Sequence, residues 1–122
     1  MHKGNPQVEE YLEAIYRLKE DGRGARTNEL AGMIGVSPAS ASEMIGRLQA
    51  KGFLTHTRYG IAELTPAGER IGKEVTEKHR LIERFLSAIG ITRNLHDEAC
   101  VLEHAVSDDV AAAMKKFLSK KK

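Results

Sequence analysis

The sequence predicts a mainly α-helical protein with an N-terminal winged helix-turn-helix domain (residues 1–64) and a C-terminal helical domain (residues 65–122). Two observations support this prediction. Apolar residues recur at helical spacing through most of the chain. The pattern changes only after Gly52, where the segment FLTHTRYGIAELT is typical of two short strands joined by a turn.

Capping residues divide the N-terminal half into three helices. Pro6 suits the first turn of a helix that runs to about Gly22, because its missing N–H has no partner to lose there. Thr27 is the expected N-cap of a short second helix. Ser37 and Pro38 form the start signal of a third helix that ends near Gly52. The expected inward-facing residues are Val8, Leu12, Ile15, Leu18, Leu30, Ile34, Ala41, Ile45 and Leu48.

The remaining elements follow the same signals. Gly60 supplies a positive φ at the turn Arg58-Tyr59-Gly60 between the two strands. Thr65-Pro66 begins a fourth helix to about Ile89, a fifth spans about Leu95 to Val106, and Ser107 caps a sixth. The order helix, short helix, tight turn, helix and hairpin is that of a winged helix-turn-helix domain.

Composition narrows the class of protein. The chain has 122 residues, 41% of them hydrophobic, and a net charge of +2 from 19 basic and 17 acidic residues. Its one cysteine excludes an intrachain disulfide and favours a reducing compartment. No apolar run resembles a signal peptide or a membrane span, so we expect a cytoplasmic protein without a membrane partner. A charge of +2 does not by itself indicate nucleic acid, so that prediction depends on local arrangement.

The outer face of the third predicted helix carries small and hydroxylated side chains. Such side chains allow a helix to approach base edges in a major groove, whereas a merely solvated face usually holds longer charged residues. Nearby arginines are spaced as phosphate contacts would be. The alternative is a small α+β domain without a ligand. The candidate DNA-binding residues are Arg26, Thr27, Ser37, Pro38, Ala39, Ser40, Ser42, Glu43, Arg47, Arg58 and Tyr59.

The segment HDEACVLEH (residues 96–104) predicts a metal site. Its His96, Cys100, Glu103 and His104 fall at i, i+4, i+7 and i+8, which is one face of a helix. Two further pairs share helical faces elsewhere, His79 with Glu83 and Glu10 with Glu13. Each pair alone is also explained as solvated surface or as a helix-stabilising contact. Together, carboxylates, imidazoles and one thiolate suit Fe²⁺, Mn²⁺ or Co²⁺ better than a structural zinc knot.

The predicted winged-helix order and the segments KHRLIERFL (78–86) and HDEACVLEH (96–104), the latter followed by SDDV, resemble the diphtheria toxin repressor family. Members of this family are metal-dependent repressors of iron and manganese homeostasis. The resemblance runs from about Val8 to Phe117. It implies that the C-terminal helices form a dimerisation domain, so that a homodimer binds palindromic double-stranded operator DNA.

The resemblance also implies two metal sites. One would use Glu10, Cys100, Glu103 and His104, and the other His79, Glu83 and His96. The manganese-type branch has carboxylates at the positions of Glu10 and Glu13 and also at the position of Cys100. The iron-type branch has cysteine at position 100 but methionine at position 10, and it carries a C-terminal SH3-like domain, for which we expect no counterpart here. The sequence therefore combines both patterns. Cys100 favours Fe²⁺, followed by Mn²⁺, with Co²⁺, Ni²⁺ or Zn²⁺ as possible substitutes in vitro.

A bound metal would act as co-repressor by selecting the conformation in which the two recognition helices match half-sites about 34–36 Å apart. The alternative is a winged-helix regulator that senses thiol oxidation at Cys100 or an organic ligand, with any metal structural. An enzyme is not expected, because a metallohydrolase needs an open coordination position and a general base, and the sequence has no HExxH motif.

Overall fold

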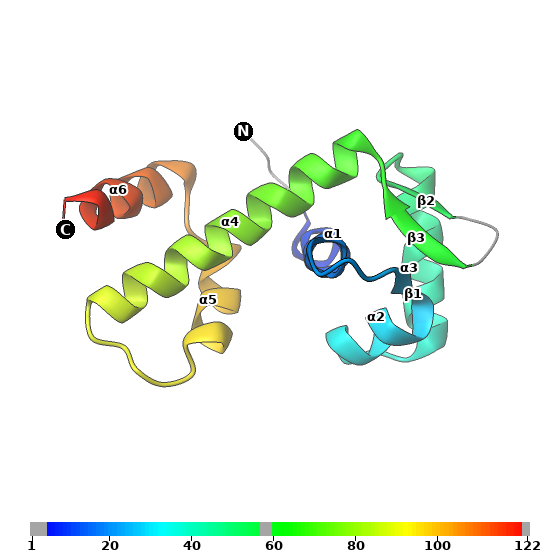
Figure 1. Cartoon of the computed structure of the whole chain (residues 1–122), viewed down its shortest axis with the longest axis horizontal. Helices are drawn as coiled ribbons and strands as arrows, with labels where there is room; N and C mark the ends of the chain where they lie inside the picture. The colour runs from blue at the N-terminus through cyan, green and yellow to red at the C-terminus, as the bar shows by residue number, and fades with distance from the viewer. Residues whose placement is uncertain (1–4, 57–59, 121–122) are drawn as a thin grey trace. The chain divides into compact units, whose positions relative to one another are not determined.

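The computed structural model describes residues 5–56 and 60–120 (Figure 1). These residues form two compact units, and the division between Glu74 and Val75 falls inside one long helix, α4 (Pro66–Ala88). The predicted boundary between residues 64 and 65 remains a prediction.

The N-terminal unit contains three helices and a small sheet. The helices are α1 (Pro6–Glu20), α2 (Thr27–Ile34) and α3 (Pro38–Ala50). The strands are β1 (Ala25–Arg26), β2 (Leu54–His56) and β3 (Ile61–Leu64), and they form an antiparallel sheet in the order β1-β3-β2. The first turns of α4 complete the unit. This arrangement is the predicted winged helix-turn-helix.

Local signals explain most of these element boundaries. Ser37 caps α3, because its Oγ accepts a hydrogen bond from the backbone N–H of Ser40 at 3.1 Å. Gly35 ends α2 at a φ of 85°, and Gly60 has a φ of 76° beside β3, as predicted. The prediction for Thr27 is wrong. Thr27 is the first residue of α2, Arg26 occupies the cap position without a side-chain cap, and Arg26 also pairs with Ile61 in the sheet.

The core of the N-terminal unit is formed by the predicted apolar faces. Leu12, Leu30 and Leu48 are fully buried, whereas Ile34 is only partly buried. Close packing of α1 on α4 depends on Gly72, since a Cβ at this position would lie 2.7 Å from the backbone oxygen of Leu12. The absence of a side chain at Gly72 therefore allows α1 and α4 to pack this closely.

The C-terminal unit contains the rest of α4 together with α5 (Leu95–Glu103) and α6 (Asp108–Ser119). Ser107 caps α6 as predicted, since its Oγ accepts from the N–H of Val110 at 3.2 Å. The small core consists of Ile82, Leu86 and Ala99, against which Leu95, Leu102, Val106 and Met114 pack. The prediction that α5 extends to Val106 is wrong. The helix ends at Glu103, and the backbone then turns as the N–H groups of residues 105 and 106 both bond to the oxygen of residue 102.

Within residues 5–56 and 60–120, no helix combines the length and the apolar character needed to cross a bilayer.

Candidate metal centre

Helix α4 supplies two donor side chains to a polar cluster in the C-terminal unit. His79 is fully buried and Glu83 is partly exposed, and they lie one turn apart on the same face. The Nε2 atom of His79 lies 3.2 Å from Oε2 of Glu83. The ring is therefore presented to the neighbouring helix rather than to solvent.

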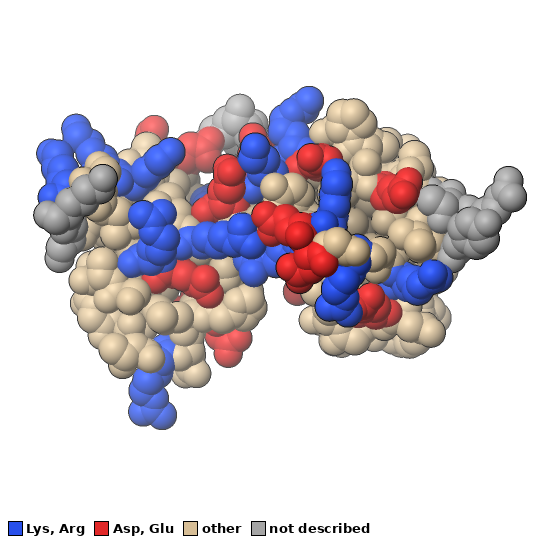
Figure 2. All heavy atoms as spheres, in the orientation of Figure 1, with Lys and Arg blue, Asp and Glu red and all other residues tan. Residues whose placement is uncertain are grey.

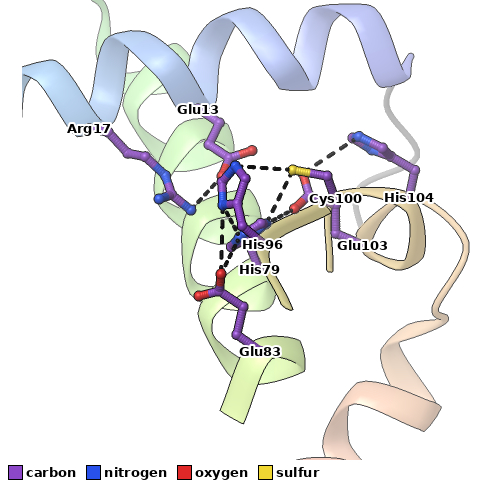
Figure 3. A network of polar contacts seen from close by, with 8 residues as sticks. All are labelled: Glu13, Arg17, His79, Glu83, His96, Cys100, Glu103 and His104. Atoms are coloured by element: carbon purple, nitrogen blue, oxygen red, sulfur yellow. Dashed lines mark hydrogen bonds and ion pairs between the residues drawn. The ribbon is translucent and has the colours of Figure 1, made fainter. Parts of the chain in front are cut away.

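Helix α5 supplies the other side of the cluster (Figure 3). His96 and Cys100 lie one turn apart, with 3.6 Å between Nε2 of His96 and Sγ of Cys100. Glu103, at the last turn, is only 3% exposed. His104 follows the end of α5, and its Nε2 lies 3.5 Å from Oε2 of Glu103. The four side chains predicted to share one helical face in HDEACVLEH thus follow one another along α5 and its C-terminal end. Asp97 and Glu98 are exposed.

His79 joins the donors of the two helices. Its Nδ1 lies 2.5 Å from Oε1 of Glu103, and its Nε2 lies 3.1 Å from Nδ1 of His96. The resemblance implies different sites for Glu103 and His96, yet both contact this one imidazole. The six predicted ligands of the C-terminal unit therefore form one connected cluster of side chains: His79, Glu83, His96, Cys100, Glu103 and His104.

The chemistry of these donors suits a divalent transition metal. Burying a carboxylate and an imidazole is costly unless they are paired, and Glu103 and His79 are both buried and in contact. Imidazole nitrogen, carboxylate oxygen and thiolate sulfur together are the donor types that bind Fe²⁺, Co²⁺ and Zn²⁺. Three of these side chains, His79, His96 and Cys100, each place a ligand atom within 4.8 Å of the other two. The residues present therefore fit such an ion.

The carboxylates predicted on the first helix, Glu10 and Glu13, lie in the N-terminal unit. Glu10 is exposed, whereas Glu13 is buried and its Oε2 forms an ion pair at 2.7 Å with Nη2 of Arg17, one turn along α1. Burial raises the pKa of the Tyr11 phenol, and the negative charge of Glu10 raises it further. Arg17 is not among the predicted site residues, although its i+4 spacing from Glu13 is a recognisable ion-pair signal.

Lys78 is a second residue that sequence reasoning missed. It precedes His79 on α4, and its Nζ donates a hydrogen bond to the backbone oxygen of Val106 in the turn after α5. The side chain of Val106 also packs against the small core of this unit. The turn that carries His104 is thus held to α4 by both a polar and an apolar contact. No sequence signal links residues 28 positions apart, so only the structure reveals this contact.

The candidate DNA-binding residues that the structure describes belong to β1, to the start of α2, and to α3 with its cap residue Ser37. Within α3 the expected outer face is exposed, and its charged members Glu43 and Arg47 form an ion pair at 3.3 Å. Arg58 and Tyr59 lie outside the described residues. Basic and acidic side chains are interspersed on the face seen in Figure 2, in agreement with the modest net charge. The exposed candidates are Arg26, Ser37, Pro38, Ala39, Ser40, Ser42, Glu43 and Arg47, and Thr27 is partly exposed.

A winged helix-turn-helix unit followed by a cluster of side chains that could hold a metal ion is the arrangement expected of a metal-dependent DNA-binding regulator. The chain matches the family described as "Iron dependent repressor, N-terminal DNA binding domain" over residues 5–62. It matches "Iron dependent repressor, metal binding and dimerisation domain" over residues 65–122. The chain therefore belongs to the iron-dependent repressor family, whose members are DNA-binding repressors and not enzymes.

Two curated relatives illustrate the similarity. The HTH-type transcriptional regulator MntR of Bacillus pumilus is 35% identical over 103 residues, which cover 84% of this chain and 72% of the relative. An uncharacterized HTH-type transcriptional regulator of Methanocaldococcus jannaschii is 35% identical over 116 residues, covering 93% of both chains. This second similarity extends over nearly the whole of this sequence.

Solved structures agree with these matches. The manganese regulator SloR superimposes with a TM-score of 0.80 and 33% identity, covering 98% of this chain and 55% of SloR. The metal-dependent transcriptional regulator MtsR gives a TM-score of 0.82 and 34% identity, covering 93% of this chain and 54% of MtsR. The chain thus spans about half the length of these regulators.

Proposed function

We propose that the protein is a homodimeric, metal-activated transcriptional repressor that binds operator DNA in the cytoplasm. One observation carries the proposal. The donor cluster formed by α4 and α5 lies in the segment that matches a metal-binding and dimerisation domain, and a helix-turn-helix unit precedes it in the chain. The relatives' descriptions as metal-dependent and manganese regulators support the same function.

The residues of α3 would read the DNA. Ser40 and Ala39 are small enough to let this helix approach base edges, and Arg47 can reach a base or a phosphate. In a two-fold dimer, two copies of α3 would enter successive major grooves about 34–36 Å apart, so the operator is expected to be a palindrome. A divalent cation would supply positive charge among the donor carboxylates when bound.

The resemblance extends the proposed ligand set to Glu10 and Glu13. Because these residues belong to the same unit as α3, ligation by them would couple metal binding to DNA binding, which is the form of linkage expected of a co-repressor. We favour Fe²⁺ over Mn²⁺, since the thiolate of Cys100 is a poor donor for Mn²⁺. The manganese regulators among the relatives argue for Mn²⁺, and a DNA-binding titration with each ion distinguishes the two.

Substitutions at Glu103 and His104 test the proposed function. We expect Glu103→Gln and His104→Ala to remove metal-dependent DNA binding, since each deletes a donor. The DNA is selected from a random duplex library by the metal-loaded protein, and affinity is measured with and without metal. Asp97→Ala, which removes an exposed carboxylate of α5, serves as the control. Normal metal-dependent binding by both donor variants would refute the assignment.

A further inference from the structure

Helix α3 carries a carboxylate on the face that would enter the DNA. Glu43 and Arg47 are the only charged residues in the sequence of this helix. Their side chains are 69% and 64% exposed, whereas Ile45 and Leu48 on the opposite face are buried. Because the buried face packs on the core of the N-terminal unit, the face with Glu43 is the one available to a major groove.

The neighbours of Glu43 on this face are small. Ala39 and Ser40 precede it by one helical turn, and Gly46 follows it at i+3. A Cβ at Gly46 would meet no heavy atom within 4 Å outside the helix backbone, so the space beside the carboxylate is open. Glu43 and Arg47 therefore extend beyond the other side chains of this face.

A carboxylate at a DNA-binding surface is unfavourable unless it receives hydrogen bonds there. Duplex DNA carries one negative charge per about 1.7 Å of its axis and repels an unpaired carboxylate. The Arg47 guanidinium lies 3.3 Å from Oε2 of Glu43, but an exposed ion pair of this kind offsets only part of the repulsion. Since an ionised carboxylate only accepts hydrogen bonds, and phosphates have no donor to offer, Glu43 needs a donor on a base.

The base edges of the major groove offer two donors, the N4 amino group of cytosine and the N6 amino group of adenine. Adenine places its N7 acceptor beside N6, which repels a carboxylate and suits a side-chain amide instead. Cytosine has no such acceptor on its own edge, and its N4 group is the usual partner of glutamate and aspartate. The chemistry of Glu43 therefore favours cytosine.

We propose that Glu43 reads one cytosine in each half-site of the operator by accepting a hydrogen bond from its N4 amino group. This inference deepens the proposed function and rests on it. The ion pair with Arg47 orients the carboxylate toward the base. At a sequence without the cytosine, the carboxylate approaches DNA unpaired, so Glu43 also acts against wrong sites.

The first test is selection of DNA from a random duplex library by the full-length protein, anaerobically, with Fe²⁺ or Mn²⁺. We expect the wild-type protein to select cytosine at one position of each half-site. Glu43→Gln should select adenine there, because an amide pairs with both N6 and N7 of adenine. Glu77→Gln, which removes an exposed carboxylate of α4, should select the wild-type sequence. A Glu43→Gln protein that retains the cytosine would overturn the proposal.

Replacement of the selected cytosine by N4-methylcytosine is the second test. The methyl group takes the place of the amino hydrogen that faces the major groove, while base pairing is kept. On this duplex the wild-type protein should lose about 5–150-fold in affinity, the range of a good base contact, and Glu43→Gln should lose almost nothing. Equal losses in the two proteins would assign the amino group to another residue and overturn the proposal. Far-ultraviolet circular dichroism verifies that the variants are folded.

Metal dependence separates this inference from the proposed function. Metal-dependent binding whose base selection ignores Glu43 would retain the repressor and overturn the cytosine contact. A cytosine contact that is equally strong with metal and with chelator would retain the contact and refute activation by metal. A protein that selects no duplex under either condition would contradict both.

Discussion

At the scale of single residues, His79 determines the geometry of the donor cluster. It is fully buried, and both of its ring nitrogens face partners: Glu103 at Nδ1, and His96 and Glu83 at Nε2. A buried ring with contacts at both nitrogens has a fixed orientation. The donors of α5 are therefore arranged around a rigid centre supplied by α4.

Substitution of Arg47 on α3 should weaken DNA binding while leaving the stability of the fold almost unchanged. Its ion pair with Glu43 is well exposed, so Arg47→Ala should change the free energy of unfolding by less than about 0.5 kcal/mol. If the guanidinium contacts DNA, the same change should weaken metal-dependent DNA binding by about 1–3 kcal/mol. Denaturant unfolding and a DNA-binding titration measure the two effects. Arg84→Ala, an exposed change on α4, is the control, and equal DNA affinity in the two variants would exclude Arg47 from the interface.

At the scale of secondary-structure elements, the turn between α5 and α6 links the cluster to the small core. Glu103 ends α5, His104 follows it, and Val106 then packs on the core while its backbone oxygen accepts from Lys78. The position of His104 thus depends on a turn that is held by the hydrogen bond from Lys78 and by the packing of Val106.

Lys78→Met tests this link, because it keeps the length of the side chain and removes the donor. We expect the free energy of unfolding to fall by about 1 kcal/mol. Metal affinity should also fall, since the turn that carries His104 becomes less well fixed. Calorimetric metal titration and chemical denaturation provide both values. Lys115→Met, on the exposed side of α6, should change neither, and identical metal affinity in the Lys78 variant would show that the turn does not position a ligand.

The helix caps could be predicted from the sequence, whereas the short strand β1 could not. Ser37 and Ser107 each precede an apolar-periodic segment, and both cap helices as expected, because capping is a local hydrogen bond. Strand β1 has only two residues and no periodicity, so it was not predicted; its pairing with β3 defines it. The same pairing holds Arg26 extended and moves the start of α2 to Thr27.

The donor cluster, like the helices, could be predicted from the sequence only in part. Helical spacing placed His96 and Cys100 one turn apart, and it did the same for His79 and Glu83. Spacing cannot show which face of α5 meets α4, because that depends on the packing of Ile82 and Ala99. The contact of His79 with Glu103 joins residues 24 positions apart and therefore appeared only in the structure.

At the scale of the whole molecule, the C-terminal unit has exposed apolar side chains that its own small core does not use. Val101 is 72% exposed on α5, and Phe117 is 42% exposed on α6. Large exposed apolar side chains that gather in one region commonly mark interfaces. Since this segment matches a dimerisation domain, a second copy of the chain is the expected partner.

Val101→Glu tests the participation of α5 in the dimer. A charge in a packed interface is costly, so the variant should be monomeric at concentrations where the wild type is dimeric. Light scattering coupled to size-exclusion chromatography gives the molar mass. Met33→Glu, which alters an apolar residue of α2 that is 50% exposed, should leave the dimer intact. A dimeric Val101→Glu protein would exclude this part of α5 from the interface.

The central claim is that a divalent metal switches on DNA binding by the whole chain, and one titration tests it directly. The selected DNA duplex is titrated with the full-length protein, anaerobically and under reducing conditions, in the presence of chelator and then with Fe²⁺, Mn²⁺, Co²⁺ or Zn²⁺. We predict an increase in DNA affinity of at least about fivefold with metal, the lower end of typical allosteric coupling, and a stronger response to Fe²⁺ than to Mn²⁺. A stronger response to Mn²⁺ would revise only the choice of metal. Equal DNA affinity with metal and with chelator would contradict the account.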